Sequence, residues 1–226
     1  MRLSSLTTSI LKNFSSINSY LLIEPGQILH TSSAGGVLAH AKVEEEFPTQ
    51  VVIYDLGNFL SVAGLFHQPN FEFEGDLVRL TGQDGEAEVQ YLYAPLSLVH
   101  RPLRIPNLPL RVIEFELPEP GWSAILNAAS LLNKSEVRIF SDGDRVEMMT
   151  YDHKNPRTHT FSMPVDAKPN GLRCDHRLNI GNLKLLKASY RVSVSSRFTM
   201  FEHTNAELKY WVACDPSSTF GEADYE

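Results

Sequence analysis

The sequence contains an internal repeat, which restricts the possible folds more than any other feature. Residues 9–30 and 124–146 both read as an amphipathic helix with an Asn near its end, a strand, a Gly-containing turn and a second strand. Residues 54–66 and 178–190 follow in the same order, with the related stretches Leu-Gly-Asn-Phe-Leu and Ile-Gly-Asn-Leu-Lys. The repeat therefore predicts two halves with one plan, each made of helix, strands, helix and strands.

The remainder of each half predicts antiparallel sheets. Runs of alternating, β-branched and aromatic residues indicate strands, and Pro25-Gly26 and Asp142-Gly143 are turn signals between paired strands. Four prolines within residues 95–111 exclude a helix or a central strand there. We interpret this stretch as a connector between domains; the alternative is a surface loop inside one domain. The expected class is α+β, with similar domains at residues 1–108 and 109–226.

The overall composition is that of an ordinary globular protein. The 226 residues are 42% hydrophobic and 21% charged, and no apolar run is long enough to cross a membrane. The first residues lack the pattern of a secretory signal, and two cysteines favour a reduced, intracellular setting. The net charge of −7, taken alone, argues against binding to nucleic acid.

The distribution of the charges gives the opposite indication. None of the 27 Asp and Glu residues lies within residues 1–23, 56–71, 121–135 or 176–201, the four stretches around the predicted helices. The same stretches hold eight Lys and Arg residues. A solvated helix face usually mixes both signs of charge. For a single helix, chance would explain the absence of carboxylates. Four helices that all lack carboxylates indicate a surface that faces a polyanion.

Helical spacing divides each predicted helix into a core side and an open side. Asp55 is the expected N-cap of the second helix. The predicted core residues are Leu6, Ile10, Phe14 and Ile17, then Phe59, Leu60 and Ala63, then Trp122, Ile125, Leu126, Ala129 and Leu132, and finally Ile180, Leu183 and Leu186. The open sides are Ser5, Ser9, Lys12, Asn13 and Ser16, then Asn58, Ser61 and His67, then Ser123, Asn127, Ser130 and Lys134, and finally Gly181, Lys184, Lys187 and Arg191.

Three stretches resemble a known family. They are similar to stretches of the DNA sliding clamps of T-even-type tailed phages, the polymerase processivity factors. The stretches are residues 6–19, residues 51–66 and the closing Tyr-Trp-Val-Ala-Cys-Asp-Pro-Ser-Ser-Thr-Phe-Gly-Glu. The resemblance extends over nearly the whole length and is strongest over residues 1–66. It implies a homotrimeric ring with twelve helices around a central hole, through which double-stranded DNA passes without sequence recognition.

The resemblance also implies partners and site residues. An ATP-driven clamp loader opens the ring, the DNA polymerase docks by a short tail, and late transcription factors are possible further partners, all in the cytoplasm of the infected bacterium. No cofactor or metal is expected. Lys12 and Lys184 match basic positions that face the hole, and the spacing adds the others. The expected DNA-facing set is Lys12, Asn13, Asn58, Asn127, Lys134, Lys184 and Lys187, and the expected partner pocket is Leu108, Pro109, Tyr210 and Val212.

Two rival functions stay open from the residues alone. An enzyme would need a nucleophile with a base, or a set of metal ligands. The best candidates are Cys174 and His176, which share one face of a predicted strand, but further ligands at close spacing are missing. We therefore predict that the protein is not an enzyme. The second rival is a non-catalytic two-domain phage structural or assembly protein, which would keep the repeat without needing acid-free helices.

Overall fold

The structure is a computed structural model that describes residues 1–83, 85–98, 105–110, 112–169 and 171–222. The chain divides into two compact units. The first consists of Met1–Ser33 and Leu38–Ile105, and the second of Ala34–Val37 and Pro106–Glu226. Each unit carries antiparallel strands covered by helices, so the expectation of an α+β chain with antiparallel sheets agrees with the described residues.

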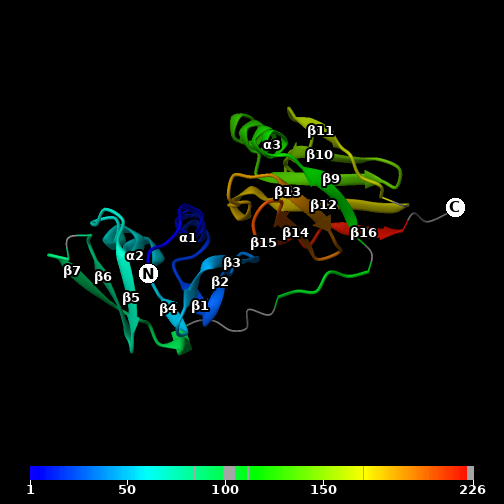
Figure 1. The fold of residues 1–226 in the computed structure, drawn as a ribbon. Coiled ribbons are helices and arrows are strands. Elements are labelled where there is room, and N and C mark those ends of the chain that lie inside the picture. Colours follow the sequence, from blue (N-terminus) through cyan, green and yellow to red (C-terminus); the bar gives the residue numbers. More distant parts are fainter. Residues whose placement is uncertain (84, 99–104, 111, 170, 223–226) are drawn as a thin grey trace. The chain divides into compact units, whose positions relative to one another are not determined.

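The first unit contains two helices and two groups of strands. Its elements in chain order are α1 (Ser5–Ile17), β1 (Leu21–Glu24), β2 (Gly26–Ser33), β3 (Val37–Phe47), β4 (Val51–Ile53), α2 (Leu56–Ala63), β5 (Asn70–Glu74), β6 (Leu77–Thr81) and β7 (Glu88–Leu92), followed by a 3₁₀ turn at Leu96–Leu98. One group has the order β4-β1-β2-β3 and the other β5-β6-β7. Helices α1 and α2 lie next to each other (Figure 1).

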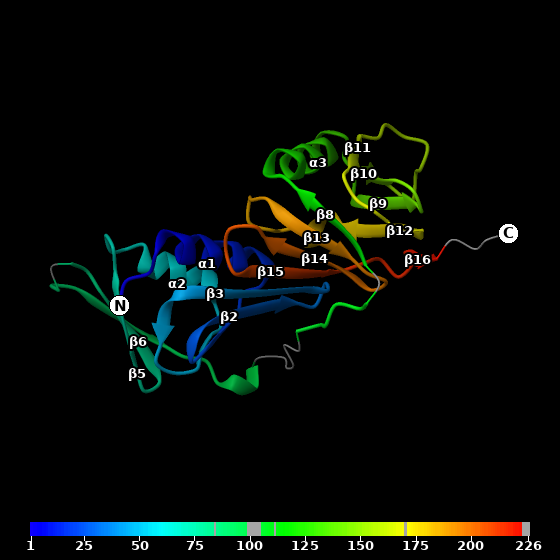
Figure 2. The same cartoon turned by 45° about the vertical axis from the view of Figure 1, so that its right-hand side comes forward.

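The second unit repeats this plan with one long helix. Its elements are β8 (Ile113–Leu117), α3 (Glu119–Leu131), β9 (Glu136–Asp142), β10 (Val146–Tyr151), β11 (Ser162–Val165), β12 (Leu172–Asn179), a 3₁₀ turn (Ile180–Asn182), β13 (Tyr190–Val194), β14 (Phe198–His203), β15 (Leu208–Ala213) and β16 (Thr219–Glu222). One sheet has the order β11-β10-β9-β12-β16, and a second group the order β15-β14-β13-β8. Helix α3 packs over β9 and β10 (Figure 2).

An aromatic cluster fills the core of the second unit. The ring of Trp122, on α3, lies 5.6 Å from that of Phe201 and 6.3 Å from that of Tyr190. Tyr190 in turn meets Tyr210 edge to face at 6.2 Å. All four side chains are buried, and each large aromatic ring that leaves water contributes about 2–3 kcal/mol. This cluster attaches α3 to β13, β14 and β15.

The predicted fourth helix is wrong: residues 183–188 contain no α-helix. The Asn179 side chain accepts a 2.7 Å hydrogen bond from the Gly181 amide, which closes a short 3₁₀ turn instead. Farther along, the amide of Leu186 donates to the hydroxyl of Tyr210, and the carbonyl of Leu186 accepts from the hydroxyl of Tyr190. Because core tyrosines satisfy both backbone groups of Leu186, these two groups are not available for helical hydrogen bonds.

His176 makes the stability of the second unit dependent on pH. Its fully buried imidazole shares a 2.9 Å hydrogen bond between Nε2 and Thr199 Oγ1, and burial lowers its pKa to about 4 from an ordinary 6.5. Since the folded pKa lies below the unfolded one, folding favours the neutral ring. The stabilisation is complete above about pH 6.5 and is lost as the pH falls from there toward 4, by about 3 kcal/mol in total.

We therefore expect His176→Gln, which cannot take up a proton, to flatten this part of the pH dependence. Urea unfolding of both proteins at pH 7 and pH 4.5 measures the effect, and the wild type should lose about 2–3 kcal/mol more than the variant between these two values. Equal losses in the two proteins would show that His176 does not carry the acid sensitivity.

Candidate nucleic-acid interface

Helix α1 presents a polar, acid-free face to solvent. The helix begins after Ser4, whose hydroxyl accepts a 3.1 Å hydrogen bond from the Thr7 amide. Its buried stripe is Thr7, Ile10, Leu11 and Phe14, and this leaves Ser5, Ser9, Lys12 and Ser16 exposed on the opposite side. Asn13, expected to face DNA, is only half exposed at the edge of this face.

One core assignment on α1 is wrong. Leu6 is 39% exposed, because the neighbouring Thr7 takes the inward position. Thr7 can be buried since its hydroxyl donates a 2.6 Å hydrogen bond to a carboxylate oxygen of Glu45 on β3. The open face of α1 is therefore less polar than the sequence predicts.

Helix α2 agrees with its predicted description except at Leu60, a predicted core residue that is only partly buried. Asp55 caps it and accepts a 2.9 Å hydrogen bond from the Asn58 amide. Phe59 and Ala63 are buried, while Asn58 and Ser61 are exposed. His67 is exposed beyond the helix end. The open face carries no lysine or arginine, and the Ser61 hydroxyl already donates to the Gly57 carbonyl, so any contact with a polyanion here relies on neutral groups such as the Asn58 amide.

Helix α3 exposes Asn127 and Ser130 as expected, but Lys134 does not belong to this face. The helix ends at Leu131, and Asn133 then adopts a left-handed backbone with φ +51°. This turn carries Lys134 inward, where it is only 9% exposed and its ammonium donates to the hydroxyl of Thr158. Helical spacing fails for Lys134 because the helix has already ended.

The last two predicted lysines lie on the irregular segment that follows the 3₁₀ turn. Lys184 and Lys187 are both exposed. The ammonium of Lys187 lies 3.1 Å from a carboxylate oxygen of Glu119, in the first turn of α3. Glu119 stands just outside the acid-free stretch, so the second unit does place one carboxylate beside its open face. Arg191, expected on a helix, lies instead on β13 and pairs with Glu116 and Glu202.

The predicted partner pocket does not form as one site. Tyr210 and Val212 are fully buried in the core of the second unit, since β15 buries consecutive residues on both of its faces. Leu108 and Pro109, by contrast, are exposed in the connector. Their neighbours Ile105 and Leu110 are also exposed, and Leu110 is fully so. The described part of the connector thus presents a short apolar stretch that the predicted set covered only in part.

Cys174 and His176 share one face of β12, as predicted, and this face points into the core. The Cys174 thiol donates to the carbonyl of Ile139, and burial raises its pKa to about 12. The pKa of His176 is lowered to about 4, also by burial. A catalytic dyad needs a thiolate beside an imidazolium, whereas both groups here are held neutral. No group of three potential metal ligands occurs among the described residues.

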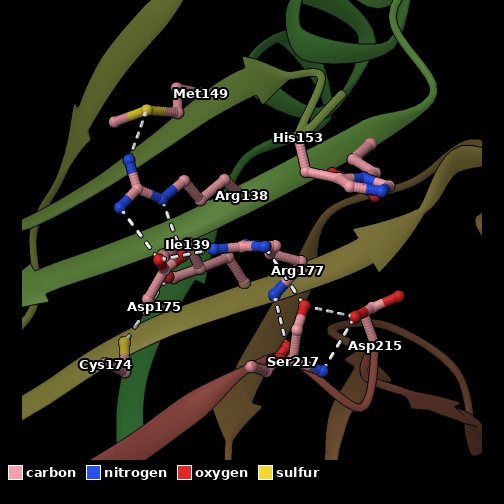
Figure 3. Close-up of polar contacts among 11 residues, drawn as sticks. Arg138, Ile139, Met149, His153, Cys174, Asp175, Arg177, Asp215 and Ser217 are labelled. Carbon is pink, nitrogen blue, oxygen red and sulfur yellow. Dashed lines mark hydrogen bonds and ion pairs between the residues drawn. The ribbon is translucent and has the colours of Figure 1, made fainter. Parts of the chain in front are cut away.

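The other face of the same sheet carries a closed network of charges (Figure 3). Arg138 on β9 and Arg177 on β12 both donate to Asp175, at 2.7 Å and 3.0 Å. Partial burial alone would raise the pKa of Asp175, but these two guanidinium groups hold it below its ordinary value. Arg177 also donates to Ser217, at 3.1 Å, ahead of β16. The hydrogen bonds of this network join β9, β12 and the segment before β16, and its two guanidinium groups and one carboxylate leave a net positive charge on this face.

Comparison with known proteins places these features in context. The family model described as DNA polymerase processivity factor matches residues 3–85. The sliding clamp of Enterobacteria phage T4 is 39% identical over 227 residues, covering 97% of this chain and 99% of that protein. The sliding clamp of Vibrio phage KVP40 is 26% identical over 225 residues, covering 95% and 99%.

Solved structures share the fold at low sequence identity. The PCNA of A. fulgidus, solved with the C-terminal region of FEN-1, superposes with a TM-score of 0.70 at 12% identity, covering 95% of this chain and 96% of that chain. The Proliferating Cellular Nuclear Antigen of Entamoeba histolytica gives a TM-score of 0.68 at 12% identity, covering 93% and 95%. In the part of the chain that the structure describes, no helix is long and apolar enough to span a membrane.

The placement of Lys134 leads to a test that separates buried from open lysines. Lys134→Glu puts a carboxylate in a buried site and removes the donor to Thr158, so we expect a decrease of about 1–3 kcal/mol in the free energy of unfolding. Lys12→Glu, on the open face of α1, should change it by no more than about 0.5 kcal/mol. Urea unfolding at pH 7 measures both, and equal effects would contradict the buried position of Lys134.

Proposed function

Because this chain belongs to the phage sliding clamps, a family of DNA polymerase processivity factors, we propose that it closes into a ring around duplex DNA and tethers the replicative polymerase. Clamps are non-catalytic, so the prediction that the protein is not an enzyme is confirmed by its family. The clamp fold expected from the resemblance is confirmed as well. The observation that carries the proposal is the set of acid-poor open faces on α1, α2 and α3.

Electrostatics supports this use of the open faces. They offer hydroxyl and amide groups with few lysines, which can touch phosphates without reading bases. Most carboxylates lie on the strands and loops, where they repel misplaced DNA. Weak, sequence-independent contacts allow the ring to slide. Each of the two units, with a boundary at the connector, serves as one clamp domain, and a ring of three chains contains six.

The ring would be lined differently from the family pattern of twelve helices. The described residues hold three α-helices in each chain, so three chains contribute nine. In the place of each missing helix stands the segment from the 3₁₀ turn to β13, with Lys184 exposed on it. We propose that Lys12, Asn58, Asn127 and Lys184 face the DNA, and that Asn13 contributes from the rim of its helix.

Free sheet edges support a head-to-tail ring. Strand β7 ends one sheet of the first unit and β11 ends one sheet of the second, each with one strand neighbour among the described residues. Such unpaired edges are sites for pairing with another chain. Leu92 on β7 is 68% exposed, and Leu131 on α3 is 83% exposed. We propose that β7 of one subunit pairs with β11 of the next.

Charges near the two edges differ in sign balance. The sheet of β7 carries Glu72, Glu74 and Glu88 around the single Arg79, whereas the exposed residues that flank β11 carry both signs, with Arg157 and Lys168 outnumbering Asp166. Opposite charges favour contacts between different edges and disfavour pairing of two β7 strands. A head-to-tail contact closes into a ring when its rotation is a simple fraction of a turn.

The remaining partners follow the family. We propose that the polymerase docks by an apolar tail on the connector, where Ile105, Leu108 and Leu110 are exposed. One structural relative was solved with a C-terminal region of FEN-1 bound, which supports docking of a partner tail. We also propose loading by an ATP-driven clamp loader, support of late transcription, and action in the cytoplasm of the infected bacterium.

The ring itself is tested by mass in solution. The wild type should have about three times the subunit mass of 25.4 kDa in light scattering. Leu92→Asp buries a carboxylate in the proposed contact, and we expect it to run as a monomer with unchanged circular dichroism. Leu110→Asp, which changes an equally apolar exposed side chain in the connector and not on β7, should remain trimeric. A trimeric Leu92→Asp variant would exclude β7 from the interface.

The clamp function is tested by processive synthesis. With the cognate polymerase and loader, the wild type should lengthen products on a primed circle but not on a short linear template, where a ring slides off. Reversing the charge at Lys12 and Lys184 together should shorten the products several-fold and leave the trimer intact, because both side chains are exposed. Absence of any stimulation by the wild type would favour the alternative of a phage structural or assembly protein.

A further inference from the structure

A groove of about 560 Å³ lies between α1 and α2, entirely within the first unit. Arg2 and Lys12 line it, with Ser5 and Thr8 between them on the α1 side. Its floor is apolar and includes Leu60 and Phe71. The groove exists because α2 ends in the small residues Ala63 and Gly64, which do not fill the space beside α1.

Among the residues that the structure describes, no carboxylate lines this groove. The nearby Glu45 is directed elsewhere, since its oxygens accept hydrogen bonds from the Ser4 amide and the Thr7 hydroxyl at the start of α1. The groove therefore combines two cations, the hydroxyl groups of Ser5 and Thr8, of which that of Thr8 already donates to the Ser4 carbonyl, and an apolar floor. A DNA backbone presents the matching chemistry, with phosphate oxygens for the donors and deoxyribose carbons for the floor.

Arg2 is fixed in position by the backbone around it. The Phe71 amide donates a 2.7 Å hydrogen bond to the carbonyl of Met1, and the Met1 ammonium donates to the Phe71 carbonyl, so the residue before Arg2 is held against β5. Arg2 is exposed, and it was missed as a DNA-facing residue because it precedes the helix on which the spacing argument depends. Arg2 and Lys12 both line this one groove.

Within its described residues, the second unit offers no comparable cationic pair on its open face. Lys134 is buried, and Lys187 is paired with Glu119, which itself adds a negative charge to that face. Lys184 is the other exposed lysine of the segment after the 3₁₀ turn. Contacts with a polyanion are therefore distributed unequally between the two units.

We propose that the groove between α1 and α2 is the main binding site for the DNA backbone, and that Arg2 and Lys12 bind its phosphates. This inference rests on the proposed clamp function and deepens it. It makes Arg2 a DNA-binding residue and assigns most of the electrostatic contact to the first unit. An apolar protein tail is the other occupant that the floor would accept, and the test distinguishes it.

The test follows methyl NMR signals of the trimer during titration with a short linear duplex at low salt. Leu3 and Leu60 report on the groove, while Ile180 and Leu186 report on the second unit. We expect the larger shifts at Leu3 and Leu60. Equal or larger shifts at Ile180 and Leu186 would overturn the proposal, as would groove shifts caused by an apolar polymerase-tail peptide and not by the duplex.

Salt dependence gives a readout that a purely structural role would not change. Arg2→Gln should lower the slope of log affinity against log salt by about 0.9 for each phosphate that the arginine no longer neutralises. Lys154→Gln, an exposed lysine in a loop of the second unit, is the matched control and should leave the slope unchanged. Equal slopes for Arg2→Gln and the wild type would overturn the proposal. Processive synthesis by the wild type tests the clamp function separately from the assignment of Arg2.

Discussion

The burial of one stripe on each helix is the constraint on which the rest of the structure depends. Phe14 on α1, Phe59 on α2 and Trp122 on α3 are each almost completely buried, and their rings fix the rotation of the helix about its own axis. Once this rotation is fixed, the opposite side of the helix can only face outward. The chemistry of that side is then decided by composition, and here it is poor in carboxylates, with Glu119 in the first turn of α3 as the exception. Packing in the core thus determines which groups can meet a polyanion.

The two units form their open faces from different structural elements. The first uses two neighbouring helices with a groove between them. The second uses one helix and an irregular segment, which the hydroxyl groups of Tyr190 and Tyr210 hold against the aromatic core through Leu186. A duplicated plan therefore does not preserve duplicated secondary structure. It preserves the position of a polypeptide segment over the sheet, while the local hydrogen bonding changes.

The sequence predicted the repeat, most of the strands and three of the four helices, because hydrophobic period and turn residues are local signals, but it did not identify β3, β5 and β16. It failed where distant residues decide. The tyrosines that satisfy Leu186 lie outside its segment, so no local pattern reveals them. Lys134 follows a left-handed turn at Asn133 that ends the helical period. Tyr210 and Val212 occur in a strand buried on both faces, where alternation carries no information about exposure.

The irregular segment has a consequence for how a ring would act on its cargo. Six equivalent units would present a nearly uniform inner wall. In the proposed ring of three chains, with one cationic groove in each, the wall would instead carry three attractive sites, one-third of a revolution apart. A double helix inside such a wall lowers its energy when its backbone reaches one of these sites, and it reaches them in turn as it advances. Translation of the ring along the duplex axis would then be accompanied by rotation of the ring about that axis.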